Sequence, residues 1–132
     1  NHKLMDPIAD MLAHIKNTGH AGRNNVVLGY SRLKHDIAEV LKAEKFVKDV
    51  EKKSKGVKHS LSIDLFVENR MPRIKGVKRL SKPSKRIYKK ASEIRAVKQG
   101  YGILVLSTPQ GVMAGYKAKK AGVGGEALFS IW

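Results

Sequence analysis

An alternating run of side chains near the middle of the chain most constrains the fold. From Leu61 to Val67 every second residue is aliphatic, and the positions between them are Ser62, Asp64 and Phe66. A two-residue period is typical of a β-strand with one buried face. The run therefore predicts a strand and makes β-structure part of any fold of this chain.

Two helices are predicted before this strand, each from a capping residue and an apolar stripe. Asp6 can cap a helix that starts at Pro7, where the missing N–H costs nothing, and a loop is expected at 17–22. Ser31 can cap a second helix, whose apolar stripe runs from Leu33 to Leu41. Further strands are expected at 26–28 and from Phe46, the latter ending in a charged turn at 52–56.

The pattern becomes mainly β beyond Met71-Pro72, where proline disfavours continuing a sheet in register. A helix is expected at 92–99 and another at 116–121, and strands are expected at 74–80, 103–108, 111–113 and 126–132. We predict an α+β fold of two small domains: an N-terminal αβαββ domain at 5–70, and a mainly β C-terminal domain with a short helix at 71–132. Residues 1–4 are interpreted as a tag remnant.

The basic residues are concentrated in the second half. The chain has 27 Lys and Arg against 11 Asp and Glu. Residues 1–70 hold 13 basic and 9 acidic residues, whereas residues 71–132 hold 14 basic residues and two acids, Glu93 and Glu126. A surface that serves only solubility usually mixes its charges. The asymmetry predicts that the second half binds a polyanion.

Several function classes lack their characteristic residues. The chain has no cysteine, which excludes disulfides, a thiol nucleophile and Cys-ligated metals. Its five histidines show no metal-ligand spacing, and there is no phosphate-binding glycine loop of the G-x-x-x-x-G-K-[ST] type. No apolar run approaches the roughly 18 residues that cross a bilayer. We expect a protein without catalytic activity, cofactor or metal.

Three clusters in the second half have side chains suited to RNA. In the first, Lys82, Lys85 and Arg86 can reach phosphates, and Tyr88 can stack on a base or serve as a half-buried strand residue.

The second cluster, Ser107–Met113, offers the hydroxyls of Ser107 and Thr108 for 2′-OH groups and base edges, although an ordinary turn has the same composition. In the third, Lys117 and two further lysines lead into a segment, 121–126, whose glycines allow close backbone approach.

These segments together resemble a known family. Three motifs are similar to those of bacterial-type small-subunit ribosomal protein eight. The first is the opening Asp-Pro-Ile-Ala-Asp at 6–10 with Ile15-Lys16-Asn17, and the second is Ser81-x-Pro-x-x-Arg-Ile-Tyr88. The third is Ser107-Thr108-x-x-Gly111-Val-Met113 with Ala121-Gly-x-Gly-Gly-Glu126. The resemblance covers 5–132. It implies a cytoplasmic ribosomal protein that binds the central domain of small-subunit (16S) ribosomal RNA early in assembly, beside small-subunit proteins five and twelve. Its own messenger RNA is a further candidate partner.

The resemblance also implies roles for single residues. Ser107, Thr108 and Gly111 fall on the main RNA-contact loop, and Tyr88 and Glu126 fall on positions that shape the same surface. Lys16 and Asn17 belong to the opening motif and are counted as candidate RNA contacts.

The sequence departs from the family pattern in both halves. Pro109 and Gln110 stand where a hydroxyl and a lysine are usual, so the contact loop loses one donor and one charge. Gly29 and Lys45 stand where proline and glycine are usual, and these changes are expected to cost the fold nothing.

Two alternatives to ribosomal RNA fit the charge. A nucleoid-type DNA-binding protein would place its basic residues on a groove-binding helix or use an intercalating apolar arm, whereas here the polar groups fall in loops between strands. A peripheral membrane protein needs a helix with one basic and one bulky apolar face, and neither first-half helix is basic enough.

Overall fold

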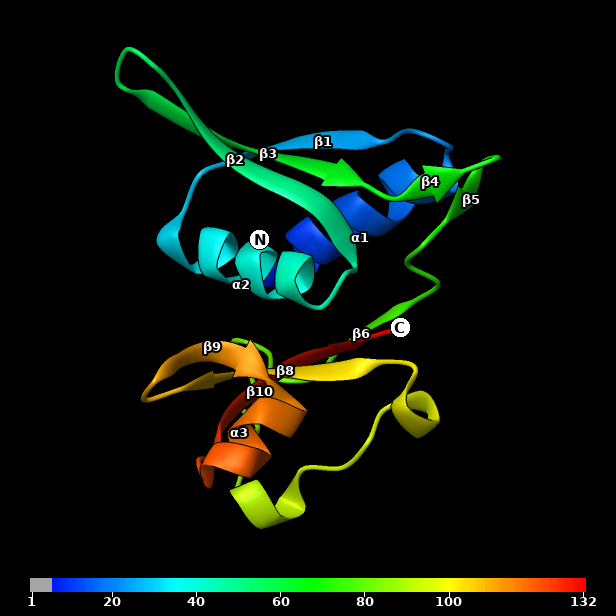
Figure 1. The fold of residues 1–132 in the computed structure, drawn as a ribbon. Helices are drawn as coiled ribbons and strands as arrows, with labels where there is room; N and C mark the ends of the chain where they lie inside the picture. The colour runs from blue at the N-terminus through cyan, green and yellow to red at the C-terminus, as the bar shows by residue number, and fades with distance from the viewer. Residues whose placement is uncertain (1–5) are drawn as a thin grey trace. The chain divides into compact units, whose positions relative to one another are not determined.

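The computed structural model describes residues 6–132, so the expected tag remnant lies outside the described residues. Contacts divide the chain into two compact units (Figure 1). The N-terminal unit is Asp10–Lys75, and the C-terminal unit is residues 6–9 together with 76–132. The predicted α+β class is confirmed. The domain boundary after Arg70 stays a prediction.

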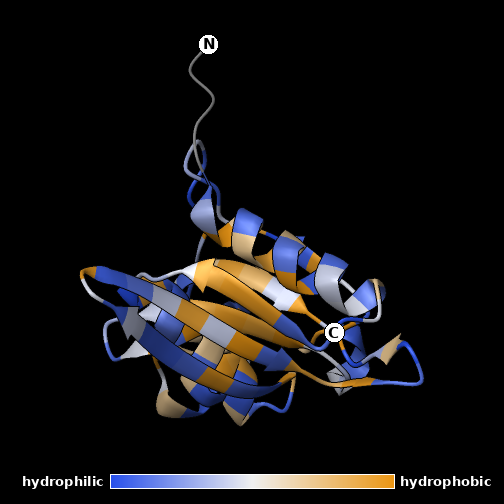
Figure 2. Ribbon diagram, turned by 90° about the horizontal axis from the view of Figure 1, so that it is seen from above, coloured by the Kyte–Doolittle hydropathy of each residue, from blue (hydrophilic) through white to orange (hydrophobic). Residues whose placement is uncertain are grey.

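The N-terminal unit contains a three-stranded antiparallel sheet in the order β1-β3-β2, with β1 at Asn25–Gly29, β2 at Val47–Lys55 and β3 at Lys58–Leu65. Helices α1 (Pro7–His20) and α2 (Arg32–Ala43) lie on one face of this sheet (Figure 1). Hydrophilic and hydrophobic residues alternate along the strands (Figure 2). A small hairpin, β4 (Val67–Glu68) with β5 (Met71–Pro72), follows.

The predicted helix starts are confirmed. The Asp6 carboxylate accepts a hydrogen bond from the Ala9 amide at 3.1 Å, and the Ser31 hydroxyl accepts one from the Lys34 amide at 3.1 Å. Helix α1 continues to His20, beyond the expected loop, because Gly19 lies one turn after buried Ile15 on the inward face.

Two details of the first half were predicted wrongly. Leu33 is exposed, because α2 buries Ile37, Ala38 and Leu41 instead. The charged turn expected at 52–56 is confined to residues 56 and 57, since β2 remains paired with β3 as far as Lys55 opposite Lys58. Its lysines can stay in a strand because both faces of this part of the hairpin are exposed to water.

Helix α2 ends in a Schellman motif that has lysine in place of glycine. The Phe46 amide donates to the Leu41 carbonyl at 2.8 Å, and the Lys45 amide donates to the Lys42 carbonyl at 3.1 Å. The motif requires a left-handed residue between the helix and Phe46, and Lys45 has φ of 66°. The expectation that lysine costs nothing here is wrong, because a Cβ disfavours this conformation.

The C-terminal unit is built around β10 (Gly125–Ile131). The sheet order is β6-β10-β8-β9, and β7 also pairs with β10. Its other strands are β6 (Val77–Arg79), β7 (Tyr88–Lys89), β8 (Ile103–Thr108) and β9 (Gly111–Ala114). Helix α3 (Gly115–Ala121) ends at Gly122, as predicted, with φ of 72°. Residues of β8, α3 and β10 form the core with Ile94.

The helix predicted at 92–99 does not form. Short 3₁₀ helices occupy Ala91–Glu93 and Lys98–Gly100, and the chain between them is not helical. Ile94 is buried in the core with Val97 packed against the same cluster, whereas Lys98 and Gln99 have φ of 48° and 55°. Packing of the two aliphatic side chains overrides the local helical pattern.

Two further contacts fix the strands of the C-terminal unit. The Arg79 guanidinium, 11% exposed, donates from Nε to both oxygens of Asp6 at 3.2 and 3.1 Å, and another nitrogen donates to the Leu128 carbonyl. Trp132 and Gly76 exchange two backbone hydrogen bonds of 3.1 Å, and the indole ring leaves no room for a Cβ at Gly76.

Lys45→Gly is expected to raise the free energy of unfolding by about 1 kcal/mol, because glycine adopts the left-handed conformation without a steric cost. Chemical denaturation followed by circular dichroism measures the change. The matched variant Lys53→Gly, in the regular part of β2, should lower stability by roughly 0.5–1 kcal/mol. A loss of stability in both variants would contradict the argument from φ.

Candidate nucleic-acid interface

Three residues from distant parts of the sequence form one row across the C-terminal sheet. Tyr88 on β7 lies opposite Glu126 on β10, and Glu126 lies opposite Ser107 on β8. Directly opposed residues of antiparallel strands project from the same face. The strand register therefore gathers an aromatic ring, a carboxylate and a hydroxyl, and the Tyr88 side chain is prominent at 69% exposed.

Two consecutive glycines allow the strands of this row to approach. A Cβ on Gly124 would lie 2.3 Å from the Lys89 carbonyl oxygen, and a Cβ on Gly125 would lie 2.2 Å from the Ser107 carbonyl oxygen. Real Cβ atoms do not approach a backbone this closely. The close approach that the glycines permit is thus to neighbouring strands of the protein itself.

The Glu126 carboxylate is bonded within the protein. One oxygen accepts hydrogen bonds from the buried Ser81 hydroxyl and from Arg86, the latter at 3.0 Å. The Ser81 oxygen also accepts from the Ile87 amide at 3.1 Å, which fixes its orientation. This carboxylate therefore adds a side-chain link between the segment 81–88 and the glycine-rich segment, which are also joined by the backbone pairing of Tyr88 with Glu126.

These contacts set the ionisation of Glu126. Burial raises the pKa of Glu126, but the hydrogen bonds from Ser81 and Arg86 and the charges of Arg86 and Arg79 outweigh burial and lower its pKa overall. The hydrogen bond and charge of Glu126 in turn raise the pKa of Arg86. Glu126 is thus an ionised structural group, and Arg86 is bound to it rather than fully available to a phosphate.

Ser81 opens the predicted motif at 81–88, but its hydrogen bond to Glu126 was not predicted. The available signal was the isolation of Glu126 as one of two acids among 14 basic residues, because a lone carboxylate in such surroundings is expected to pair. The identity of its partners depends on strand register, which the spacing of the residues does not reveal.

The hydroxyls of Ser107 and Thr108 have different roles. The Thr108 hydroxyl donates to the Gly111 carbonyl at 2.7 Å and accepts from the Gln110 amide at 3.1 Å. Its only proton is therefore used within the β8–β9 turn, where Gly111 has φ of 115°. Among residues 6–132 no hydrogen bond involves the Ser107 hydroxyl, so both its donor and its acceptor sites can serve a ligand.

The basic candidates are not members of the row. Lys82 and Lys85 are exposed at a tight turn, where their backbones exchange hydrogen bonds of 2.9 and 3.0 Å. Lys117 is exposed on α3, with its ammonium 5.9 Å from the centre of the Tyr116 ring. Lys16 and Asn17 belong to the N-terminal unit, whereas the row belongs to the C-terminal unit.

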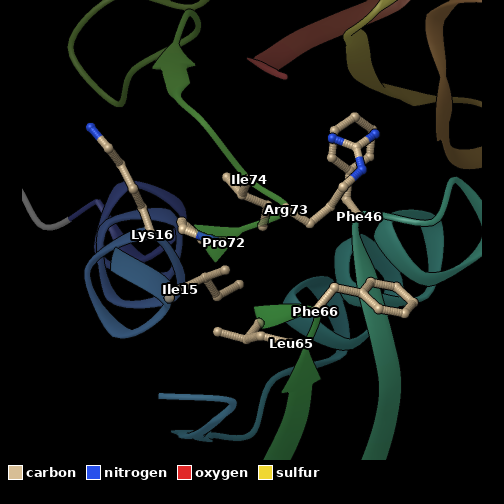
Figure 3. A pocket seen from close by; sticks show the side chains of 9 residues that line it. Ile15, Lys16, Phe46, Leu65, Phe66, Pro72, Arg73 and Ile74 are labelled. Carbon is tan, nitrogen blue, oxygen red and sulfur yellow. The ribbon is translucent and has the colours of Figure 1, made fainter. Parts of the chain in front are cut away.

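The depressions of the molecule differ in what they can hold. All three residues of the row line a shallow depression, together with Lys89, Pro109 and other neighbouring residues. In the N-terminal unit a cavity next to Ile15 has a volume of about 10 Å³, room for about one water (Figure 3). The first is an open surface on which a base or sugar could rest, whereas the cavity next to Ile15 is too small for either.

Two other kinds of site were searched for in residues 6–132. No group of three or more His, Asp or Glu side chains in this range could hold a metal ion. No helix in this range is long and apolar enough to cross a membrane.

The fold and this surface define a small, strongly basic α+β protein with a hydroxyl, an aromatic ring and lysines on one sheet, a class suited to nucleic acid. Residues 6–132 match the family described as Ribosomal protein S8, and the chain belongs to this family. The resemblance identified from the motifs is thereby confirmed.

Relatives match over almost the whole chain. A protein named small ribosomal subunit protein uS8 from Synechococcus elongatus is 43% identical over 129 residues, which cover 96% of this chain and 97% of the relative. Proteins of the same name from Heliobacterium modesticaldum and Kocuria rhizophila are 45% and 42% identical over 130 residues, with 98% of each chain covered.

Gly125→Ala is expected to lower the free energy of unfolding by about 1–3 kcal/mol, because the new methyl group would overlap the Ser107 carbonyl. Thermal unfolding measures the loss. Gly29→Ala is the matched control, since Gly29 has open space around its Cα and no positive φ, and it should be neutral or slightly stabilising. Equal stability of both variants would contradict the steric argument.

Glu126→Gln is expected to destabilise the fold near neutral pH and to lose this effect in acid. Because the pKa of folded Glu126 is lowered, its ionised form stabilises the fold above the unfolded value of about 4.3. That contribution disappears as pH falls through the lower folded-state pKa. Denaturation curves between about pH 7 and about pH 3 measure how the difference in unfolding free energy between the wild type and Glu126→Gln decreases. Glu51→Gln, at an exposed position, is the control and should differ little from the wild type in stability. A difference for Glu126→Gln that does not change with pH would contradict the role of Glu126 as an ionised structural group.

Proposed function

We propose that this protein is a structural constituent of the small ribosomal subunit in the cytoplasm and has no catalytic role. It binds the central domain of small-subunit ribosomal RNA and helps the subunit to assemble. The observation that carries the proposal is the cross-strand row of Tyr88, Glu126 and Ser107, which presents a ring and an unused hydroxyl on a basic unit. Membership of the ribosomal protein S8 family supports the same partner.

The chemistry of the row suits an irregular RNA. The Ser107 hydroxyl is short and uncharged, and it can both donate to and accept from a 2′-OH group or a base edge. The exposed Tyr88 ring offers a face on which an unpaired base or a sugar can rest. Glu126 holds the strand between them through Ser81 and Arg86, so it positions the row and needs no contact with RNA.

The charge of the C-terminal unit supplies attraction without selectivity. Residues 6–9 and 76–132 contain 12 Lys and Arg against three acids, and two of these acids, Asp6 and Glu126, are already paired with arginines. The remaining positive charge attracts the phosphates of a nucleic acid whatever its base sequence. RNA is favoured over duplex DNA because the ring and the hydroxyls lie on strand ends and a turn, whereas the basic helix α3, Gly115–Ala121, has only 7 residues.

The family resemblance supports two further parts of the proposal. Small-subunit proteins five and twelve are the proposed neighbours in the particle. The protein's own messenger RNA is a proposed second RNA ligand, which would have to present a similar arrangement of 2′-OH groups and unpaired bases.

Ser107→Ala is expected to weaken binding to a small-subunit ribosomal RNA transcript by about 1–3 kcal/mol with unchanged stability, because it removes a hydroxyl that has no internal partner. The slope of log K against log salt should not change, since no charge is removed. Thr108→Ala should instead lower the unfolding temperature, because its hydroxyl closes the β8–β9 turn. Filter binding at several salt concentrations and thermal unfolding measure both effects.

A triple variant, Lys82→Gln, Lys85→Gln and Lys89→Gln, provides the electrostatic control. It should weaken binding to cognate and unrelated RNA by similar factors and make the salt slope shallower by about 2–3. Unchanged affinity for Ser107→Ala, or equal competition by duplex DNA, would overturn the proposed recognition surface.

A further inference from the structure

The β2–β3 hairpin of the N-terminal unit extends beyond the rest of its sheet. The pairing of β1 with β3 ends at Gly29 opposite Ser60, whereas β2 and β3 remain paired as far as Lys55 opposite Lys58 (Figure 1). Every residue from 51 to 59 is exposed, including Val57 at the tip, which is 94% exposed. This end of the hairpin is thus a two-stranded ribbon surrounded by water.

Three lysines gather on one face of this ribbon. Lys55 lies directly opposite Lys58, and Lys53 lies two residues before Lys55 on the same strand, so all three side chains project from one face. Lys52 belongs to the other face, where its ammonium lies 4.3 Å from the centre of the Tyr30 ring. Among residues 6–132, no ion pair includes any of the three lysines. Three acids, Asp49, Glu51 and Asp64, lie further back on their face.

The three lysines destabilise the protein when no polyanion is bound. Like charges directly opposite each other in an antiparallel pair are destabilising, and Lys55 and Lys58 are such a pair. The ribbon buries no apolar side chain that could offset this repulsion. A bound polyanion would reverse the sign of the interaction, because each ammonium would then face a negative group.

We propose that Lys53, Lys55 and Lys58, which we call the hairpin lysines, form a second RNA-binding element that holds a phosphate backbone. The proposal rests on the proposed function, which supplies the RNA. Lysine binds phosphate as a point charge and reads no sequence, so the element adds affinity and leaves selection to the row at Ser107. A protein partner would need an apolar contact area, and the ribbon offers only Val57.

The test is the salt dependence of binding to a small-subunit ribosomal RNA transcript. The triple variant Lys53→Gln, Lys55→Gln and Lys58→Gln should make the slope of log K against log salt shallower by about 2–3. Its unfolding temperature at low salt should equal or exceed that of the wild type, because the repulsion is gone. The triple arginine variant at the same positions should keep the wild-type slope.

A matched control removes the same charge elsewhere on the N-terminal unit. Arg23, Lys45 and Lys48 are exposed and outside the ribbon, and changing all three to Gln should alter the slope by less than 1. An equal change in the control and the hairpin variant would overturn the proposal, because the effect would then follow net charge alone.

Ser107→Ala, measured in parallel, separates this proposal from the proposed function. If Ser107→Ala weakens binding and the hairpin variant keeps the wild-type slope, the hairpin proposal is overturned and the proposed function stands. If the wild-type protein binds the transcript no better than unrelated RNA of equal length, both are overturned. A shallower slope for the hairpin variant alone supports the element.

Discussion

Where β10 begins, the backbone runs so close to the neighbouring strands that two consecutive positions have no room for a side chain. At Gly124 and Gly125 a Cβ would lie within 2.3 Å of carbonyl oxygens on β7 and β8. This clearance lets a single strand pair on both edges, and the pairing brings Tyr88, Glu126 and Ser107 into one row. The candidate interface is therefore a consequence of backbone packing first and of side-chain chemistry second.

The C-terminal unit uses its few carboxylates internally. Asp6 caps α1 and pairs with Arg79, and Glu126 joins Ser81 to Arg86. Both carboxylates are mostly shielded, with side chains 19% and 15% exposed, so they contribute little negative charge to the surface that faces a ligand. The acids hold the strands, and the exposed lysines attract phosphate. Arg79 and Arg86 serve the fold together with these acids, and the lysines remain for the partner.

Local patterns predicted most of the elements but not the contacts between them. The caps at Asp6 and Ser31 and the alternation around Ile63 involve residues adjacent in sequence, so the sequence reveals them directly. Segment 92–99 has a helical pattern, yet burial of Ile94 in the core decides its shape. Lys45 could not be predicted either, because the end of α2 imposes its left-handed φ and lysine gives no sign of that conformation.

The candidate site was also predicted only in part, because its segments are visible in the sequence but the contacts between them are not. Motif spacing identified the segments that carry the hydroxyls, the ring and the basic residues. It did not distinguish the two hydroxyls, because the hydrogen bonds of Thr108 arise from a turn that closes on Gly111. The only tryptophan, Trp132, follows β10 and packs on Gly76 in the C-terminal unit. Intrinsic indole fluorescence therefore reports on the unfolding of the C-terminal unit, and the N-terminal unit contains no tryptophan.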